Sequence, residues 1–237
     1  MNNKFTTYLL YGIGEIILVV IGILIAVNID DWSENRKNQK EEKAILKDLH
    51  QEFLSNKTRL QNHLAYHKVL AEATSAIMQL IGKPTSVLAQ NNLDSLIYLS
   101  IDHHDFNPSQ SVISELISSG KLNLISSDEL RLLIFEWESN MDEKVEAYET
   151  MDELNQNLTL PYLTKNASMK DIDFYGLGKP NGRSKFASKN ENLFQQIEFE
   201  NHMDNQYWCI TNYINKLERL EEIIDKILEE TANPTNN

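Results

Sequence analysis

Cysteine is almost absent from this sequence of 237 residues, in which Cys209 stands alone. One cysteine excludes an intramolecular disulfide and a thiolate metal cluster built within one chain, and we expect Cys209 to be a small buried hydrophobic residue. Basic residues are also scarce, since 22 Lys and Arg face 35 Asp and Glu, which gives a net charge of -13 and a pI near 4.9. We therefore expect no nucleic-acid partner.

Strand patterns and catalytic motifs are missing as well. No segment alternates apolar and polar residues as a half-buried strand does, and no internal repeat of clear period is present. The sequence contains no Gly-x-Ser-x-Gly, no nucleotide-binding fingerprint and no recognisable Cys-His pairing. With 35 acids, a pair of carboxylates alone does not indicate catalysis. We expect an all-α protein that is not an enzyme, with no catalytic residue, bound metal or cofactor.

Charge is nearly absent from residues 8–29, where Glu15 is the one acid. As a helix this segment reaches roughly 33 Å, enough for the ~30 Å hydrocarbon core of a bilayer. The stretch after Glu15 is too short to span alone, so we expect Glu15 to lie inside the bilayer. The run is too long for a signal peptide, is preceded only by Lys4 and lacks a small-residue cleavage site, which favours a retained anchor over residues 1–31. Aromatic residues suited to the two interfaces are Tyr8, Tyr11 and Trp32.

Small residues follow one side of this span. A stripe with spacings of three and four contains Gly12, Glu15, Val19, Gly22 and Ala26. Small residues let helices approach closely in lipid, and a carboxyl group on the same side would find a partner there. We expect this transmembrane interaction face to support a homo-oligomer or contact with another membrane protein. The alternative is a plain lipid anchor whose Glu15 is protonated or thins the bilayer.

Residues 32–232 carry the patterns of a helical soluble domain. Ser33–Ile81 contains no proline or glycine and has apolar residues at helical spacing, so it predicts one long helix that can continue directly from the span. Gly82 and Pro84 end it. Further helices are expected over about 85–99, over 109–119 with Ser109 as N-cap and Gly120 as C-cap, and from a capping box at Ser126 to about Leu160.

The C-terminal part changes composition twice. Residues 161–190 begin with Pro161, which should stop the preceding helix, and hold six basic and two acidic residues with three glycines. This basic Gly-rich loop could meet an anionic ligand or head group, or neutralise its own acidic domain, and we favour the second. A last helix is expected from about Asn190 to Glu230, with an apolar stripe broad enough for a bundle, followed by a flexible tail at 233–237.

Two histidines form the most specific candidate for a metal site. His63 and His67 lie four residues apart on the long helix, a spacing that can aim two imidazoles at one metal ion. No Glu follows His63, and apolar residues share the face, so rim or half-buried histidines are the favoured interpretation. A membrane-tethered metal-dependent hydrolase, with His103, His104 and Asp105 as added ligands, is the alternative hypothesis.

Two long strings carry a family resemblance: GEIILVVIGILIAVNIDDWSENRK at Gly14–Lys37 and FNPSQSVISELISSGKLNLISSDELR at Phe106–Arg131. They resemble an uncharacterised bacterial family of single-span membrane proteins, a domain of unknown function. The resemblance implies an N-terminal anchor and an all-helical domain, and it implies no activity, cofactor or catalytic residue. Within the second string, Gly120 permits a tight reversal and Leu122, Leu124 and Ile125 return the chain to the core, so a fold determinant is favoured over a ligand-contacting turn near Asp102–Asn107.

Topology is left open by the residue counts. Basic residues after the span outnumber those before it, which favours a cytoplasmic domain, yet acids are interleaved with them and long domains translocate largely regardless of charge. Members of the resembled family carry a longer basic segment before the span, which inclines the expectation towards the periplasm, although this chain has only Lys4 there. We expect a single-pass protein of the bacterial inner membrane that acts as an interaction or sensing module through its transmembrane helix. A periplasmic ligand-sensing domain is a further alternative.

Overall fold

A computed structural model describes residues 3–176, 182–186 and 189–232, without the side chains of 3–8 and 11. Helices are the regular elements of these ranges, and no strand occurs in them. The expected all-α fold with a long N-terminal helix is confirmed. The elements are α1 (Asn3–Leu80), α2 (Thr85–Leu88), α3 (Leu93–Ile101), α4 (Ser111–Ser119), η1 (Lys121–Leu124), α5 (Asp128–Leu154), η2 (Asn155–Thr159), α6 (Leu160–Asn166), α7 (Met169–Ile172), η3 (Asp173–Tyr175), η4 (Asn190–Gln195) and α8 (Ile197–Ala232).

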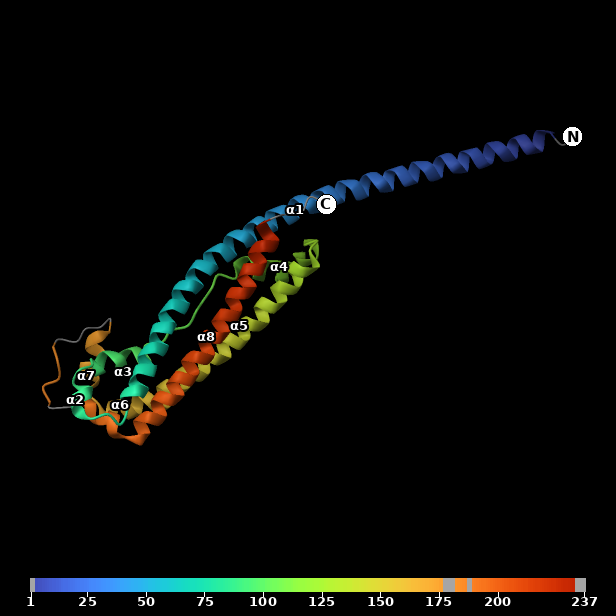
Figure 1. Ribbon diagram of the computed structural model, residues 1–237. Coiled ribbons are helices and arrows are strands. Elements are labelled where there is room, and N and C mark those ends of the chain that lie inside the picture. Colours follow the sequence, from blue (N-terminus) through green and yellow to red (C-terminus); the bar gives the residue numbers. More distant parts are fainter. Residues whose placement is uncertain (1–2, 177–181, 187–188, 233–237) are drawn as a thin grey trace.

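Helix α1 is continuous from the apolar segment into the domain. It has 78 residues, and its first half projects away from all other elements (Figure 1). The expected continuity between residues 8–29 and the long amphipathic helix is thus found, because no proline or glycine interrupts the chain between them. The helix ends at Leu80, and in the turn that follows Gly82 has a φ of 73°, in the left-handed region, and its N–H donates to Phe194 O at 2.8 Å.

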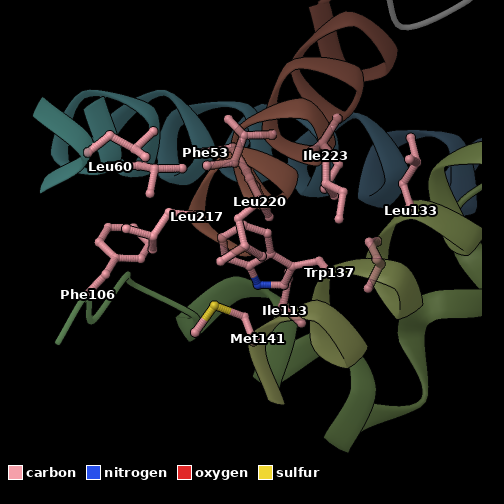
Figure 2. Packing of buried hydrophobic residues seen from close by; sticks show 14 of the residues in the cluster. Phe53, Leu60, Phe106, Ile113, Leu133, Trp137, Met141, Leu217, Leu220 and Ile223 are labelled. Carbon is pink, nitrogen blue, oxygen red and sulfur yellow. The ribbon is translucent and has the colours of Figure 1, made fainter. Parts of the chain in front are cut away.

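The first hydrophobic core lies between α1, α5 and α8. Helices α1 and α8 run antiparallel, since Lys57 pairs with Asp225 at 2.7 Å and Lys68 pairs with Glu218 at 2.8 Å. In Figure 2, large apolar side chains from α1, α5 and α8 meet around the Trp137 indole. Helix α4 adds Ile113 and Leu116 to this core. The broad apolar stripe of the last helix is therefore used for packing within a bundle, as the sequence indicates.

A second core forms a distal cap at the end of the bundle remote from the N-terminus (Figure 1). Short helices contribute Leu88, Ile97 and Leu163, and the far ends of α1 and α8 contribute Ile77 and Phe199. Since α1 rises about 1.5 Å per residue, this cap lies roughly 75 Å along the helix from residue 29.

The N-caps of two helices correct the sequence analysis. Ser127, and not Ser126, caps α5 by accepting from Leu130 N, because the Ser126 hydroxyl and N–H bond to the Glu42 carboxylate instead. Gln110, and not Ser109, is the N-cap of α4, and its side chain makes no capping bond. Gly120 is the expected C-cap, with φ of 71°.

Pro161 does not stop the helix that precedes it. The chain passes from α5 through a π turn, Asn155–Thr159, into α6, where Pro161 lies in the first turn. Proline is tolerated there because the first N–H groups of a helix lack intrahelical partners, and the wider turn accommodates its ring. The expected basic loop at 161–190 therefore begins with α6, α7 and η3, whereas its Gly178, Lys179 and Pro180 lie outside the described residues.

The last helix also begins later than expected. Residues 190–195 form η4, Gln196 is extended with φ of -120°, and α8 starts at Ile197. The expected flexible tail at 233–237 lies outside the described residues.

Candidate functional site

A segment without regular structure, residues 102–110, joins α3 in the distal cap to α4 in the first core. We call it the strap; in Figure 1 it follows the length of the bundle beside α1 and α8. The side-chain amide of Asn56 makes two hydrogen bonds to the C-terminal end of the strap. Asn56 Nδ2 donates to Ser109 O at 2.7 Å, and Ser109 N donates to Asn56 Oδ1 at 2.9 Å. Further along the strap, Arg59 donates to the Asn107 carbonyl.

Glu52 of α1 supplies the missing cap of α4. Its Oε2 accepts from the hydroxyls of Ser109 and Ser111, at 2.9 and 2.6 Å, and from Val112 N at 3.2 Å. A carboxylate at a helix N-terminus satisfies free N–H groups and faces the positive end of the helix dipole. Asn107 and Ser109 of the strap are thus tied to α1 by hydrogen bonds, which fix the position of the start of α4.

A buried charge pair anchors the middle of the strap. Lys144 of α5, with 1% of its side chain exposed, donates to both carboxylate oxygens of Asp105, at 2.8 and 3.0 Å, and to Phe106 O at 2.9 Å. Tyr213 of α8 donates to Asp105 Oδ1 at 2.9 Å, and its oxygen accepts from Phe106 N at 2.8 Å. The ammonium group therefore has three oxygen acceptors in place of water, which a buried charge requires.

Sequence reasoning missed Lys144 and Tyr213 as partners of Asp105. A signal was present, because Lys144 occupies an apolar-face position of its helix, at helical spacing from Met141 and Tyr148. A lysine on such a face indicates a buried acceptor, although its identity depends on the long-range path of the strap.

Three imidazole rings meet where the strap crosses α1: His63 and His67 lie beneath the strap, and His104 belongs to the strap and is exposed. We call these three residues the histidine cluster. The ring centroids of His63 and His67 are 4.5 Å apart, and His104 lies 4.6 Å from His63 and 5.6 Å from His67. His67 is fully buried and His63 is 9% exposed, so the expectation of rim or half-buried histidines is wrong. The reason is the strap, which covers the face of α1 on which both residues lie.

Burial controls the ionisation of these rings. The pKa of His63 is lowered to about 4 and that of His67 to about 3. Desolvation by burial is the largest cause of both shifts, and the nearby His104 contributes to both in the same direction. Burial also lowers the pKa of His103, against the opposing effect of Asp152. The rings of His63 and His67 are therefore neutral at neutral pH.

The metal hypothesis finds no geometry to support it. Although the histidine cluster assembles, no three His, Cys, Asp or Glu side chains of the described residues are placed to hold a metal ion. The rings instead pack on aromatic neighbours, with His63 at 5.6 Å from Phe106 and His67 at 5.0 Å from Tyr213. The described residues therefore give the metal-dependent hydrolase no support.

The transmembrane interaction face lies in the projecting part of α1. All five of its residues, Gly12, Glu15, Val19, Gly22 and Ala26, are exposed. By length and composition α1 is long and apolar enough to cross a membrane, since an 18-residue window reaches a mean hydropathy of 2.5 with none of it buried. Trp32 is exposed beside the Arg36 guanidinium, 5.4 Å from the ring centroid, whereas the side chains of Tyr8 and Tyr11 lie outside the description.

The described part of the basic segment contacts its own domain. Arg183 donates to Asp94 Oδ2 and Tyr175 OH, both at 2.8 Å, and its guanidinium lies 4.5 Å from the Phe174 ring centroid. These contacts agree with the favoured interpretation of a segment that neutralises its own acidic surface. Cys209 is buried as expected, and burial raises the pKa of its thiol to about 11.

The fold and its projecting apolar helix define a class: all-helical proteins with one candidate membrane-spanning helix. Within it, the chain belongs to a family of unknown function, DUF6090, whose model matches residues 15–154. The match runs from Glu15 through the strap to the end of α5, so it includes the whole of the second string and all of the first except Gly14. No curated protein and no solved structure matches the chain.

Proposed function

We propose that this protein is a single-pass membrane-anchored interaction module that associates through its transmembrane helix and passes that association on to its helical domain. No reaction is assigned to it. The observation that carries the proposal is the continuity of α1, which holds the apolar span and one wall of the bundle core in a single helix. A rotation or displacement of the span therefore acts directly on the bundle.

The span itself offers a surface for a partner. Around most of its circumference it presents Ile, Leu and Val, which suit lipid, while Gly12, Gly22 and Ala26 leave one side flat. A Cβ added at Gly12 or Gly22 meets nothing within 4 Å, so these glycines are not required by contacts within one chain. Glycines at these positions would allow a second helix to approach closely. Glu15 on the same side would then hydrogen bond across the interface.

A transmembrane association assay on the full chain tests this proposal. Gly22→Leu fills the flat side and should lower dimer cross-linking at least about fivefold. Gly14→Leu is the matched control, because residue 14 lies roughly 110° around the helix from the face at 100° per residue. A span that is monomeric, or that responds equally to both substitutions, overturns self-association.

For the cellular location we propose the inner membrane of a bacterium with the helical domain in the periplasm. The resemblance to single-span bacterial proteins supports the first part, and the basic segment that precedes their spans supports the second. Fusion of alkaline phosphatase and of green fluorescent protein to the C-terminus separates the two sides. Phosphatase activity without fluorescence is expected, and the opposite pattern places the domain in the cytoplasm.

A further inference from the structure

The histidine cluster lies at the junction of three parts of the molecule. His63 and His67 belong to α1, which carries the candidate span, and His104 belongs to the strap. The strap in turn links the two hydrophobic cores, because α3 packs in the distal cap and α4 packs in the first core. A change in the charge or position of these rings therefore affects contacts to the bundle, the distal cap and the projecting helix.

Two imidazole nitrogens in this cluster have no hydrogen-bond partner. The Nδ1 of His67 lies 3.0 Å from the His63 carbonyl oxygen, and because a carbonyl only accepts, this nitrogen carries the hydrogen. Its Nε2 is then an unprotonated lone pair, and it is buried without a partner, as is the Nε2 of His63. A proton added to either Nε2 creates a buried N–H without an acceptor.

Among the surrounding charges, His104 and Lys144 oppose a proton on His63, whereas Asp105 favours one. On α1 and the strap, the groups near the two rings are Tyr66, His103, His104 and Asp105; on α5 and α8 they are Lys144, Tyr148 and Tyr213. Asp105 already accepts from Lys144 and Tyr213. The nearby carboxylates of Asp102 and Asp152 face Tyr66 and His103. Two imidazolium rings would thus lie beside each other and near the Lys144 ammonium without a carboxylate of their own.

We propose that the histidine cluster is a proton-operated latch: neutral His63 and His67 hold the strap against α1, and proton uptake by these rings releases it. Release removes His104 from the two rings and gives both Nε2 atoms access to water. Because burial lowers the pKa of His63 and His67, the latch is closed at neutral pH and opens in acid. The latch does not depend on self-association of the span.

Hydrogen exchange on the full chain in lipid nanodiscs tests the latch. The reporters are the strap amides of Phe106 and Ser109 and the amide of Val112 in the first turn of α4, which donate to groups on α1 and α8. After correction for intrinsic exchange rates, lowering the pH from ~7.5 to ~5 should raise strap opening at least about tenfold, since each released histidine with an ordinary pKa contributes up to ~30-fold. Amides of residues 220–227 in α8 are the internal reference and should change much less.

Variants assign the effect to the cluster. His63→Gln combined with His67→Gln should abolish the pH response of the strap, whereas His50→Gln should keep it, because His50 contacts Thr231 away from the strap. Unchanged strap protection in acid, or a full response in the double variant, overturns the proposal. If the double variant does not fold, NMR titration of the wild-type histidines decides: titration of His63 and His67 near 6.5 without strap opening also overturns it.

Discussion

Lys144 donates to Asp105 at 2.8 Å from a position inside the protein, and this contact joins helix α5 to the strap. Both residues are polar, and their contact lies where the strap meets α5 and α8. The pair gives the strap one register, because Lys144 also binds the Phe106 carbonyl and Tyr213 binds both strap residues. The family match extends over both partners.

Removing one member of this pair should destabilise the protein strongly. Lys144→Met leaves the Asp105 carboxylate without its cation, and we expect the free energy of unfolding to fall by about 3–5 kcal/mol in chemical denaturation of the full chain in detergent. The double variant Lys144→Met with Asp105→Asn should recover part of that loss, because no unpaired charge remains. Strictly additive losses in the double variant would show that the two side chains do not act as a pair.

A second prediction concerns the contact between Phe53 of α1 and Trp137 of α5, whose rings meet edge to face at 5.0 Å. Both are fully buried (Figure 2). Phe53→Ala should lower the free energy of unfolding by about 3–5 kcal/mol, from lost burial and from the cavity it leaves. Phe135→Ala is the matched control, since Phe135 is 55% exposed on α5 and should change stability by no more than about 0.5 kcal/mol. Equal losses of stability in the two variants would contradict the packing of Phe53 in the core.

The reversal after α4 gives a third prediction. Gly120 has φ of 71°, and an added Cβ meets nothing within 4 Å, so the cost of a side chain there is purely conformational. Gly120→Ala should destabilise by about 1–2 kcal/mol in the same denaturation experiment, whereas the exposed Ser119→Ala should change stability by less than about 0.5 kcal/mol. A neutral Gly120→Ala would mean that the turn adopts another conformation.

The helical fold followed from local patterns, whereas the site did not. Residues 33–81 have no helix breaker, so a single long helix was predictable, and Gly120 fixed the end of α4. The predicted cap of α5 differs by one residue from the observed cap because Glu129, three residues after Ser126, completes a capping-box pattern that Ser127 lacks. The choice between them comes from Glu42, which binds Ser126 from 84 positions away in sequence. Pro161 was misjudged because a π turn precedes it.

The histidine cluster shows the same limit. The spacing of His63 and His67 predicted that their side chains share one face of a helix, and it did so correctly. Their burial and the arrival of His104 depend on the path of the strap, which is set by Glu52 and Asn56 through bonds to residues more than 50 positions away. Helical periodicity carries no information about such a path.

The last prediction is the pH dependence of global stability. Since the pKa values of His63 and His67 fall from 6.5 to about 4 and about 3 on folding, the unfolded chain binds more protons below pH 6.5. Their contribution to stability is therefore complete above this pH and is lost as the pH falls towards about 4, with a slope of up to ~1.4 kcal/mol per pH unit for each ring. Denaturation of the full chain at several pH values between about 7.5 and 4 measures it.

The double variant His63→Gln with His67→Gln isolates this contribution from the other titrating groups. His103 and His202, whose pKa values are also lowered by burial, remain in it and add the same slope to both proteins. The difference between wild type and variant should therefore steepen below pH ~6.5 and level off below about 3. A difference independent of pH would mean that both rings bind protons equally in the folded and unfolded protein, contrary to their burial beneath the strap.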